Sequence, residues 1–132
     1  MRTTNLRANQ LSPEAYEWYL KYLKALDTLD IEAYGKFLAQ DCSLQSNNEP
    51  PMEGKDAVMQ GLASYWTTFA SLEHELLNIY GSDSSFVLEA LNHYNRHDGK
   101  AVNLPLPSLI VTKRDWLLQF DFTLIPHHYL RN

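Results

Sequence analysis

The chain has 132 residues, a length typical of one domain that buries its own apolar core. An apolar share of 45% argues against intrinsic disorder, and a net charge of −5 without a basic stripe argues against nucleic acid as a partner. The polar N-terminal residues, the lack of an apolar run of about 20 residues and the single cysteine, Cys42, predict a cytoplasmic protein with no membrane segment and no internal disulfide.

The first predicted element is an amphipathic helix that begins after Ser12 and ends near Asp27. Ser12 supplies an N-cap hydroxyl, Pro13 fits the first helical position, and Glu14 places a carboxylate near the positive end of the helix dipole. Apolar and aromatic side chains then recur at three- and four-residue spacing, which predicts one wide buried face. They are Tyr16, Trp18, Tyr19, Leu20, Tyr22, Leu23 and Leu26.

Two shorter helices are predicted downstream. Asp30 is a candidate N-cap for a helix that reaches Leu38. Gly35 inside it costs about 1 kcal/mol relative to alanine, so packing rather than propensity must hold this helix. A short strand over residues 42–45 and a polar, proline-containing loop separate it from a third amphipathic helix over residues 55–69.

After Ser71 the hydrophobic period changes from 3.6 towards 2, which predicts strands. Asp98-Gly99 is typical of a tight hairpin. Pro105 and Pro107 remove two amides from the same hydrogen-bonding side, which predicts an edge or a bulge there. The predicted strands cover residues 72–80, 85–95, 101–112 and 116–125.

Helices followed by antiparallel strands indicate an α+β fold. We expect three N-terminal helices packed in the concave face of a strongly curved, mainly antiparallel sheet of about five strands, with a cavity between the layers. The predicted domain covers residues 12–126. Residues 1–11 are expected to be disordered or loosely attached, and residues 127–132 form a C-terminal tail.

Four stretches of this sequence resemble the nuclear-transport-factor-2-like superfamily, and within it the SnoaL-like group of polyketide cyclases and ketosteroid isomerases. The resemblance spans residues 12–126 and implies a cone-shaped pocket for a small ligand. Because the fold hosts enzymes, transport factors and ligand binders alike, it does not by itself imply one activity. The stretches are residues 26–34, 37–41, 54–58 and 94–102.

The resemblance places Tyr22 where the steroid isomerases carry a tyrosine that stabilises a developing oxyanion. A phenol in an apolar pocket is a strong donor to an enolate oxygen. The alternative is that Tyr22 is one aromatic of a core-facing helix. The same alignment places Ser46 where those isomerases carry a carboxylate base, and a serine alone does not accept a proton near neutral pH.

Polyketide cyclases of the family carry an aspartate on the last strand, and here that strand contains Asp121. Strand alternation places Gln119, Asp121 and Thr123 on one side. If Asp121 faces the cavity, desolvation would raise its pKa and suit it to acid–base chemistry. If that side is instead a dimer face or a wet edge, Asp121 would only pair with a basic residue.

Several other side chains are predicted to contact the ligand. The apolar ones would shape the pocket, while His74 and Glu89 could complete a polar cluster with Asp121 or serve a structural or surface role. These candidates are Trp18, Phe37, Met59, Tyr65, Trp66, His74 and Glu89.

No metal site or cofactor is predicted. His93 and His97 would be roughly 13 Å apart along one strand, and the adjacent His127 and His128 would point apart in an extended tail. Cys42 has no catalytic companion in the sequence and fits a small buried hydrophobe.

The sequence is therefore compatible with two functions. One is a cofactor-free cyclase or isomerase that acts by acid–base chemistry on a small apolar carbonyl compound, with Asp121 as the acid/base and Tyr22 as a hydrogen-bond donor. The other is a non-catalytic ligand-binding, dimerisation or protein-interaction module on the same fold. The expected partners are a small apolar or aromatic ligand and a second copy of the chain, paired through the sheet.

Overall fold

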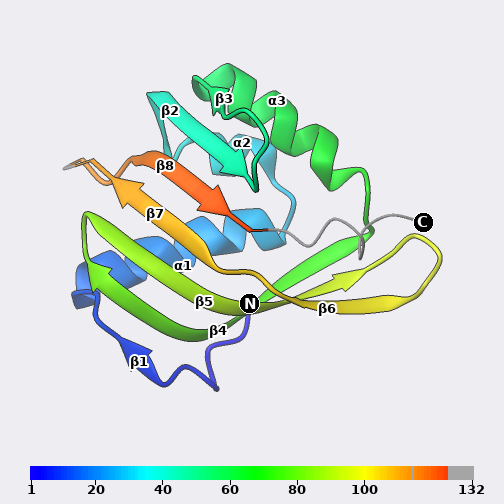
Figure 1. The fold of residues 1–132 in the computed structure, drawn as a ribbon, viewed down its shortest axis with the longest axis horizontal. Helices are drawn as coiled ribbons and strands as arrows, with labels where there is room; N and C mark the ends of the chain where they lie inside the picture. The colour runs from blue at the N-terminus through cyan, green and yellow to red at the C-terminus, as the bar shows by residue number, and fades with distance from the viewer. Residues whose placement is uncertain (114, 125–132) are drawn as a thin grey trace.

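The computed structural model describes residues 1–113 and 115–124 (Figure 1). The helices are α1 (Pro13–Asp27), α2 (Ile31–Gly35) and α3 (Lys55–Trp66). The strands are β1 (Ala8–Asn9), β2 (Leu38–Ser46), β3 (Met52–Glu53), β4 (Ser71–Ser82), β5 (Ser85–Asn95), β6 (Ala101–Pro105), β7 (Ser108–Thr112) and β8 (Leu118–Thr123). The expected strand end at residue 125, the tail over residues 127–132 and the pair His127 and His128 lie outside the described residues.

The strands form one open, curled sheet in the order β1-β4-β5-β7-β8-β2-β3, and β6 pairs with β5 beside this path. The β1–β4 and β2–β8 pairs are parallel, while the others are antiparallel. The predicted α+β class with a mainly antiparallel sheet is therefore confirmed. The sheet has more strands than expected because β1 and β3 contain only two residues each, too short to produce a hydrophobic period.

The two prolines divide the strand predicted over residues 101–112 into β6 and β7, which adds one more strand to the sheet. β6 ends at Pro105 and β7 begins at Ser108, and both pair antiparallel with β5, β6 along residues 91–95 and β7 along residues 85–88. Proline donates no backbone hydrogen bond, so the strand leaves the ladder where the prolines occur. Within the described part of the chain, β6 has β5 as its single strand neighbour, which agrees with the predicted edge.

The N-terminal segment differs from our expectation. Residues 1–11 lack a hydrophobic period, yet Ala8 and Asn9 pair with β4, and the Arg2 amide donates to the His74 carbonyl at 2.7 Å. Backbone groups make this attachment, and every residue type except proline carries both a donor and an acceptor. The side-chain pattern therefore carried no signal for it.

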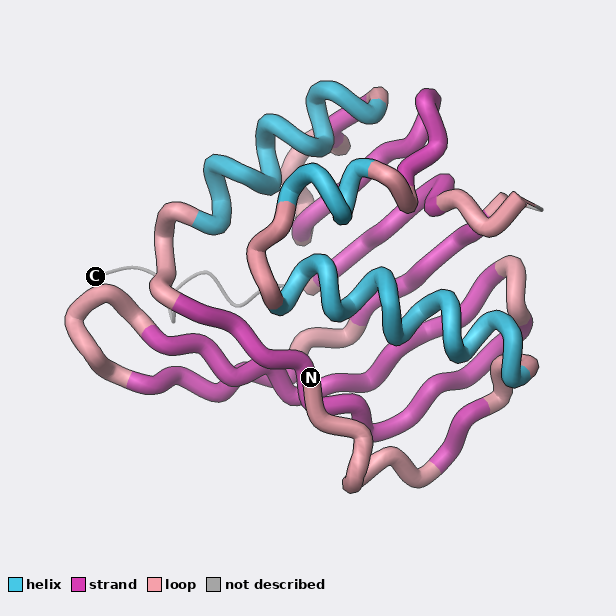
Figure 2. Tube along the Cα trace, turned by 180° about the vertical axis from the view of Figure 1, so that it is seen from behind, coloured by secondary structure: helices cyan, strands magenta, loops and turns pink. Residues whose placement is uncertain are grey.

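All three helices lie on one face of the sheet (Figure 2). The N-caps of α1 and α2 match the predicted ones, since Ser12 Oγ accepts from the Ala15 amide and Asp30 Oδ1 from the Ala33 amide, each at 3.1 Å. Aromatic packing joins the layers, with the rings of Tyr19 on α1 and Phe86 on β5 edge to face at 4.8 Å. Among the described residues, no helix combines the length and apolarity needed to cross a bilayer.

Candidate functional site

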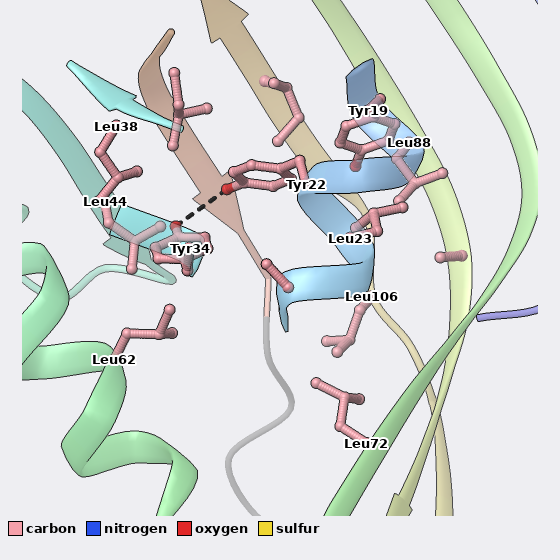
Figure 3. Close-up of a cluster of buried hydrophobic side chains, with 14 of the residues drawn as sticks. Tyr19, Tyr22, Leu23, Tyr34, Leu38, Leu44, Leu62, Leu72, Leu88 and Leu106 are labelled. Carbon is pink, nitrogen blue, oxygen red and sulfur yellow. Dashed lines mark hydrogen bonds between the residues drawn. The ribbon is translucent and has the colours of Figure 1, made fainter. Parts of the chain in front are cut away.

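A cavity of about 340 Å³ lies between the helices and the sheet. Most of its wall is aliphatic or aromatic, with polar groups gathered in two places. Its apolar lining includes Leu23, Leu26, Leu44, Leu62, Trp66, Leu72, Leu88 and Leu106. Figure 3 shows how several of these side chains converge with Tyr22 and Tyr34. Such a wall suits a small ligand that is mostly hydrophobic.

The first polar group centres on Asp121, which is only 6% exposed. Tyr22 donates its hydroxyl proton to Asp121 Oδ2 at 2.8 Å, and the Thr123 hydroxyl donates to Oδ1 at 3.0 Å. Because each hydroxyl has one proton, Tyr34 must donate to Tyr22 at 3.1 Å, the bond drawn in Figure 3. In the same way, Ser108 donates to Thr123 at 2.9 Å. Two hydroxyl chains thus end on the two carboxylate oxygens, and we call these five residues the Asp121 cluster.

Burial raises the pKa of Asp121 above its ordinary value. Hydrogen bonds from Tyr22 and Thr123 oppose this shift, as does any positive charge on His74. In the described residues no lysine or arginine forms an ion pair with this carboxylate. Burial, with the negative charge of Asp121, raises the pKa of Tyr22 well above its ordinary range, so Tyr22 stays a neutral donor. A carboxyl group in this setting can accept a proton and return it.

The alternation expected for the last strand holds at its centre. Asp121 and Thr123 both line the cavity. Gln119 does not line it and donates to the Asp41 carbonyl at 3.1 Å. Leu118, expected on the outer side, is fully buried, because the pairing of β7 with β8 shifts register between Val111 and Thr112.

The second polar group lies on β4 and β5. His74 lines the cavity, and its Nδ1 is 2.5 Å from Oδ1 of Asp27, the last residue of α1. The His74 amide donates to Asp27 Oδ2 at 3.1 Å, and the amino group of Met1 lies at the same distance from that oxygen. Burial alone raises the pKa of Asp27, but the bonds from His74 outweigh it and hold this pKa below its ordinary value. Asp27 is therefore a charged group that fixes the His74 ring.

Asn92 lies directly across from His74 in the β4–β5 ladder and also lines the cavity. It is 3% exposed, and its Oδ1 has no hydrogen-bond partner among the residues that the structure describes. A buried acceptor without a donor costs about 1–3 kcal/mol. Beside it, the hydroxyls of Tyr65 and Tyr94 are 2.9 Å apart.

The structure brings five of the sequence-predicted site residues to the cavity wall. They are Asp121, Tyr22, Tyr65, Trp66 and His74. Ser46, the position where the isomerases carry their base, also lines the cavity.

The other four candidates do not line the cavity. Trp18 stacks on Tyr22 with ring centroids 5.5 Å apart, and Phe37 packs edge-on against the same ring at 6.0 Å. Both side chains therefore pack against the Tyr22 ring without lining the cavity. Met59 fills the space beside Gly35 between α2 and α3. Glu89 is exposed on the opposite face of β5 and accepts from Asn78 at 3.3 Å. For Glu89 the reason is strand alternation, since its neighbour Leu88 faces inward.

Several residues of the site were missed at the sequence level. Asp27, Tyr34 and Ser108 gave no usable signal, because their partners are far away in the chain. Asn92 did give one: along β5 it shares the buried face with Phe86, Leu88, Ala90 and Tyr94, where an amide side chain is unusual.

Comparisons with known proteins agree with this architecture. The model of the SnoaL-like domain matches residues 19–115. A search of the curated proteins found no match.

Solved structures similar to this chain have low sequence identity and therefore show the fold alone. A protein classed as a SnoaL-like polyketide cyclase from Shewanella denitrificans OS-217 is 14% identical, with a TM-score of 0.75 over 90% of this chain and 95% of that one. TerC co-crystallised with polyporic acid is 12% identical, with a TM-score of 0.76 over 89% and 98%. An LEH-like epoxide hydrolase of M. tuberculosis is 13% identical, with a TM-score of 0.73 over 89% and 86%.

Proposed function

Because the chain belongs to the SnoaL-like family, we propose that its cavity binds a small apolar or aromatic carbonyl compound and transfers a proton to and from the carbon beside the carbonyl group, without a cofactor. The observation that supports this most strongly is the environment of Asp121. It is a carboxyl group inside an apolar cavity, held by hydroxyls, and no lysine or arginine of the described residues forms an ion pair with it. In this proposal the three helices close the concave side of the curled sheet and make a cone-shaped pocket.

The proposed reaction begins with Asp121 as a carboxylate. It removes a proton from the carbon, and the C–H electron pair becomes the double bond of an enolate whose oxygen carries the negative charge. Asp121 is then neutral, so Tyr22 no longer needs to donate to it and is free to donate to the enolate oxygen. Return of the proton from Asp121 to another carbon completes an isomerisation in which no atom or electron is gained or lost. Return to the same carbon restores the ketone, and if the Asp121 carboxyl has meanwhile exchanged its proton with D₂O, that carbon gains a deuterium.

Tyr34 supports this exchange from α2. Its hydroxyl donates to Tyr22, and a donor at the end of a hydrogen-bonded chain strengthens the next bond along it. Trp18 and Phe37, packed on the Tyr22 ring, limit its motion. Tyr22 is therefore positioned to donate its hydroxyl proton either to Asp121 or to the enolate oxygen.

The test is isotope exchange with 2-tetralone, a small aromatic ketone with acidic hydrogens beside its carbonyl. In D₂O at neutral pH, proton NMR should show loss of these hydrogens faster with the protein than with buffer alone. Tyr22→Phe should slow the catalysed exchange by about 10²–10³-fold. Asp121→Asn should reduce it to the buffer rate, because an amide does not accept the proton.

Asp41→Asn is the matched control, since Asp41 is exposed, pairs with Lys113 at 2.8 Å and does not line the cavity. It should leave the exchange rate unchanged. Equal exchange in the wild-type protein and in Asp121→Asn would refute the role of Asp121.

Ser46 favours a second candidate function. It lines the cavity where the isomerases have their base, and it accepts no proton near neutral pH. The alternative is a ligand-binding protein without catalysis. Binding of 2-tetralone with exchange at the buffer rate would select this alternative.

A second copy of the chain is the protein partner that we propose. The outer face of the sheet carries an apolar row that crosses three strands: Val87 pairs with Leu109, Leu109 pairs with Phe122, and Val111 pairs with Phe120. Val87 is 40% exposed and the other four side chains are only partly buried. We call these five residues the outer apolar patch, and its burial against an identical patch would stabilise a symmetric dimer.

A further inference from the structure

We propose that His74 and Asn92 form a second polar subsite of the cavity, and that this subsite binds a hydroxyl or N–H group of the ligand. The inference rests on the proposed function only in that a ligand occupies the cavity. It narrows the ligand class to carbonyl compounds that carry a hydrogen-bond donor away from the carbonyl group.

His74 presents an acceptor to the cavity. Its Nδ1 faces the carboxylate of Asp27, and two acceptors do not bond to each other, so Nδ1 must carry the proton. In the neutral ring the other nitrogen, Nε2, then has a free lone pair. No group within the described residues donates to it, although the side chain is only 12% exposed. Asp27 sets this tautomer and is a positioning residue.

Asn92 presents a second acceptor. Its side chain is buried, and no group within residues 1–113 and 115–124 donates a hydrogen bond to its carbonyl oxygen Oδ1. A buried amide oxygen without a donor can accept a proton donor from a ligand.

The two acceptors are neighbours, because residues paired across antiparallel strands have Cα atoms about 4.5–5.5 Å apart. A ligand carboxylate or phosphate would place further acceptor oxygens against Nε2 of His74 and Oδ1 of Asn92. No hydrogen bond could form between them, so such a ligand would not bind at this subsite. A hydroxyl or N–H group supplies the missing proton. The subsite should therefore discriminate strongly between ligands with and without a hydrogen-bond donor, because a ligand without one leaves the two buried acceptors unpaired.

The subsite is separate from the Asp121 cluster. Ser108 of that cluster pairs with Leu88 on β5, and Asn92 lies four residues further along the same strand, roughly 13 Å away. The wall between the two groups includes Leu88 and Leu106, whose amide donates to the carbonyl of Ala90 between Leu88 and Asn92 on β5. The ligand that fits is therefore polar at both ends and hydrophobic between them.

A matched pair of probes tests the subsite: 6-hydroxy-2-tetralone and 6-methyl-2-tetralone, which share the carbonyl group and differ only in hydroxyl against methyl. Isothermal titration calorimetry should give the hydroxy compound at least about tenfold higher affinity for the wild-type protein. In Asn92→Leu and in His74→Phe the preference should fall to about twofold or less. Asn92→Leu removes an unpaired buried acceptor, so it should fold at least as well as the wild type.

Leu88→Met is the matched control, because it changes the cavity wall without removing a polar group and should keep the tenfold preference. Equal affinity of both probes for the wild-type protein would overturn the subsite and leave the proposed function intact. If neither probe binds, the proposed function fails as well.

A second measurement needs no variant. In ¹⁵N NMR of the wild-type protein above neutral pH, His74 should show a protonated Nδ1 and an unprotonated Nε2. The opposite tautomer, with the proton on Nε2, would remove the acceptor from the cavity and overturn the proposal.

Discussion

Asp121 shows at the scale of one residue how a functional group is kept in an unfavourable place. Removing a carboxylate from water costs several kcal/mol, and no lysine or arginine in the described chain compensates for it. Tyr22 and Thr123 replace part of the lost hydration. A core built only for stability would place an apolar residue here, so under the proposed function the protein loses stability at Asp121 to keep an acid–base group in the cavity.

Because burial of the ionised carboxylate is unfavourable, we predict that Asp121→Asn stabilises the protein at neutral pH. The pKa of Asp121 is raised in the folded state, so its contribution to stability is present below its unfolded pKa, about 4, and is lost as the pH rises through the folded value. The melting temperature of the variant should exceed that of the wild type at pH 7, by roughly 3–5 °C for each kcal/mol. The difference should shrink towards zero as the pH falls to about 4.

The pKa of Asp41 is shifted in the opposite direction to that of Asp121, so Asp41 serves as the control. The hydrogen bond from Lys113 lowers its pKa, so Asp41→Asn should leave the melting temperature at pH 7 unchanged or slightly lower. Differential scanning calorimetry of both variants between pH 4 and 8 measures the contrast. A melting temperature of Asp121→Asn below that of the wild type at pH 7 would show that the carboxylate is not strained by burial.

At the scale of the elements, two glycines allow segments to approach closely. A Cβ on Gly35 would lie 2.7 Å from the terminal carbon of Met59, so glycine lets α2 and α3 meet. The low helix propensity noted at this position is therefore the consequence of a packing requirement. Gly81, in the β4–β5 hairpin, has φ +131°, and a Cβ there would lie 2.5 Å from the Ser85 carbonyl oxygen.

The hairpin predicts a graded response to alanine. Gly81→Ala should lower the free energy of unfolding by about 2 kcal/mol or more, because it combines a strained φ with a backbone clash. Gly99→Ala shares the positive φ, at +85°, but its Cβ meets nothing within 4 Å, so it should cost only about 1 kcal/mol. Urea unfolding of both variants measures the difference. Equal losses would mean that the clash is relieved without cost.

At the scale of the whole molecule, the sheet separates two kinds of surface. One face, with the helices, encloses the cavity, and the other carries the outer apolar patch. An exposed apolar row across adjacent strands is typical of an interaction surface. The two faces share β5, β7 and β8, so association through the patch would also brace the strands that hold the Asp121 cluster.

We expect the protein to sediment as a dimer at micromolar concentration, and Leu109→Arg to shift it to monomer. A charge at the centre of the patch would be desolvated on both subunits of the dimer. Gln60→Arg adds the same charge to an exposed position of α3 and should leave the dimer intact. Analytical ultracentrifugation distinguishes the two, and a wild-type monomer at all concentrations would exclude this interface.

The sequence by itself determined the order of the three helices and of the longer strands. Ser12 and Asp30 cap their helices as predicted, and the turn at Gly99 closes with the Arg96 amide donating to the Lys100 carbonyl at 2.8 Å. These features depend on neighbours in the chain, so local chemistry suffices. The sequence also placed Asp121 on a strand with one polar side, and the resemblance to the family picked it out together with Tyr22.

Only the tertiary structure decided which side chains meet. Tyr22 and Asp121 are 99 residues apart, and Asp27 and His74 are 47 apart. Strand register and helix docking set these contacts, and a shift of one residue would turn each strand side chain to the other face. The N-terminal strand β1 was beyond prediction for a related reason, because its attachment to β4 uses backbone groups that nearly all residues share.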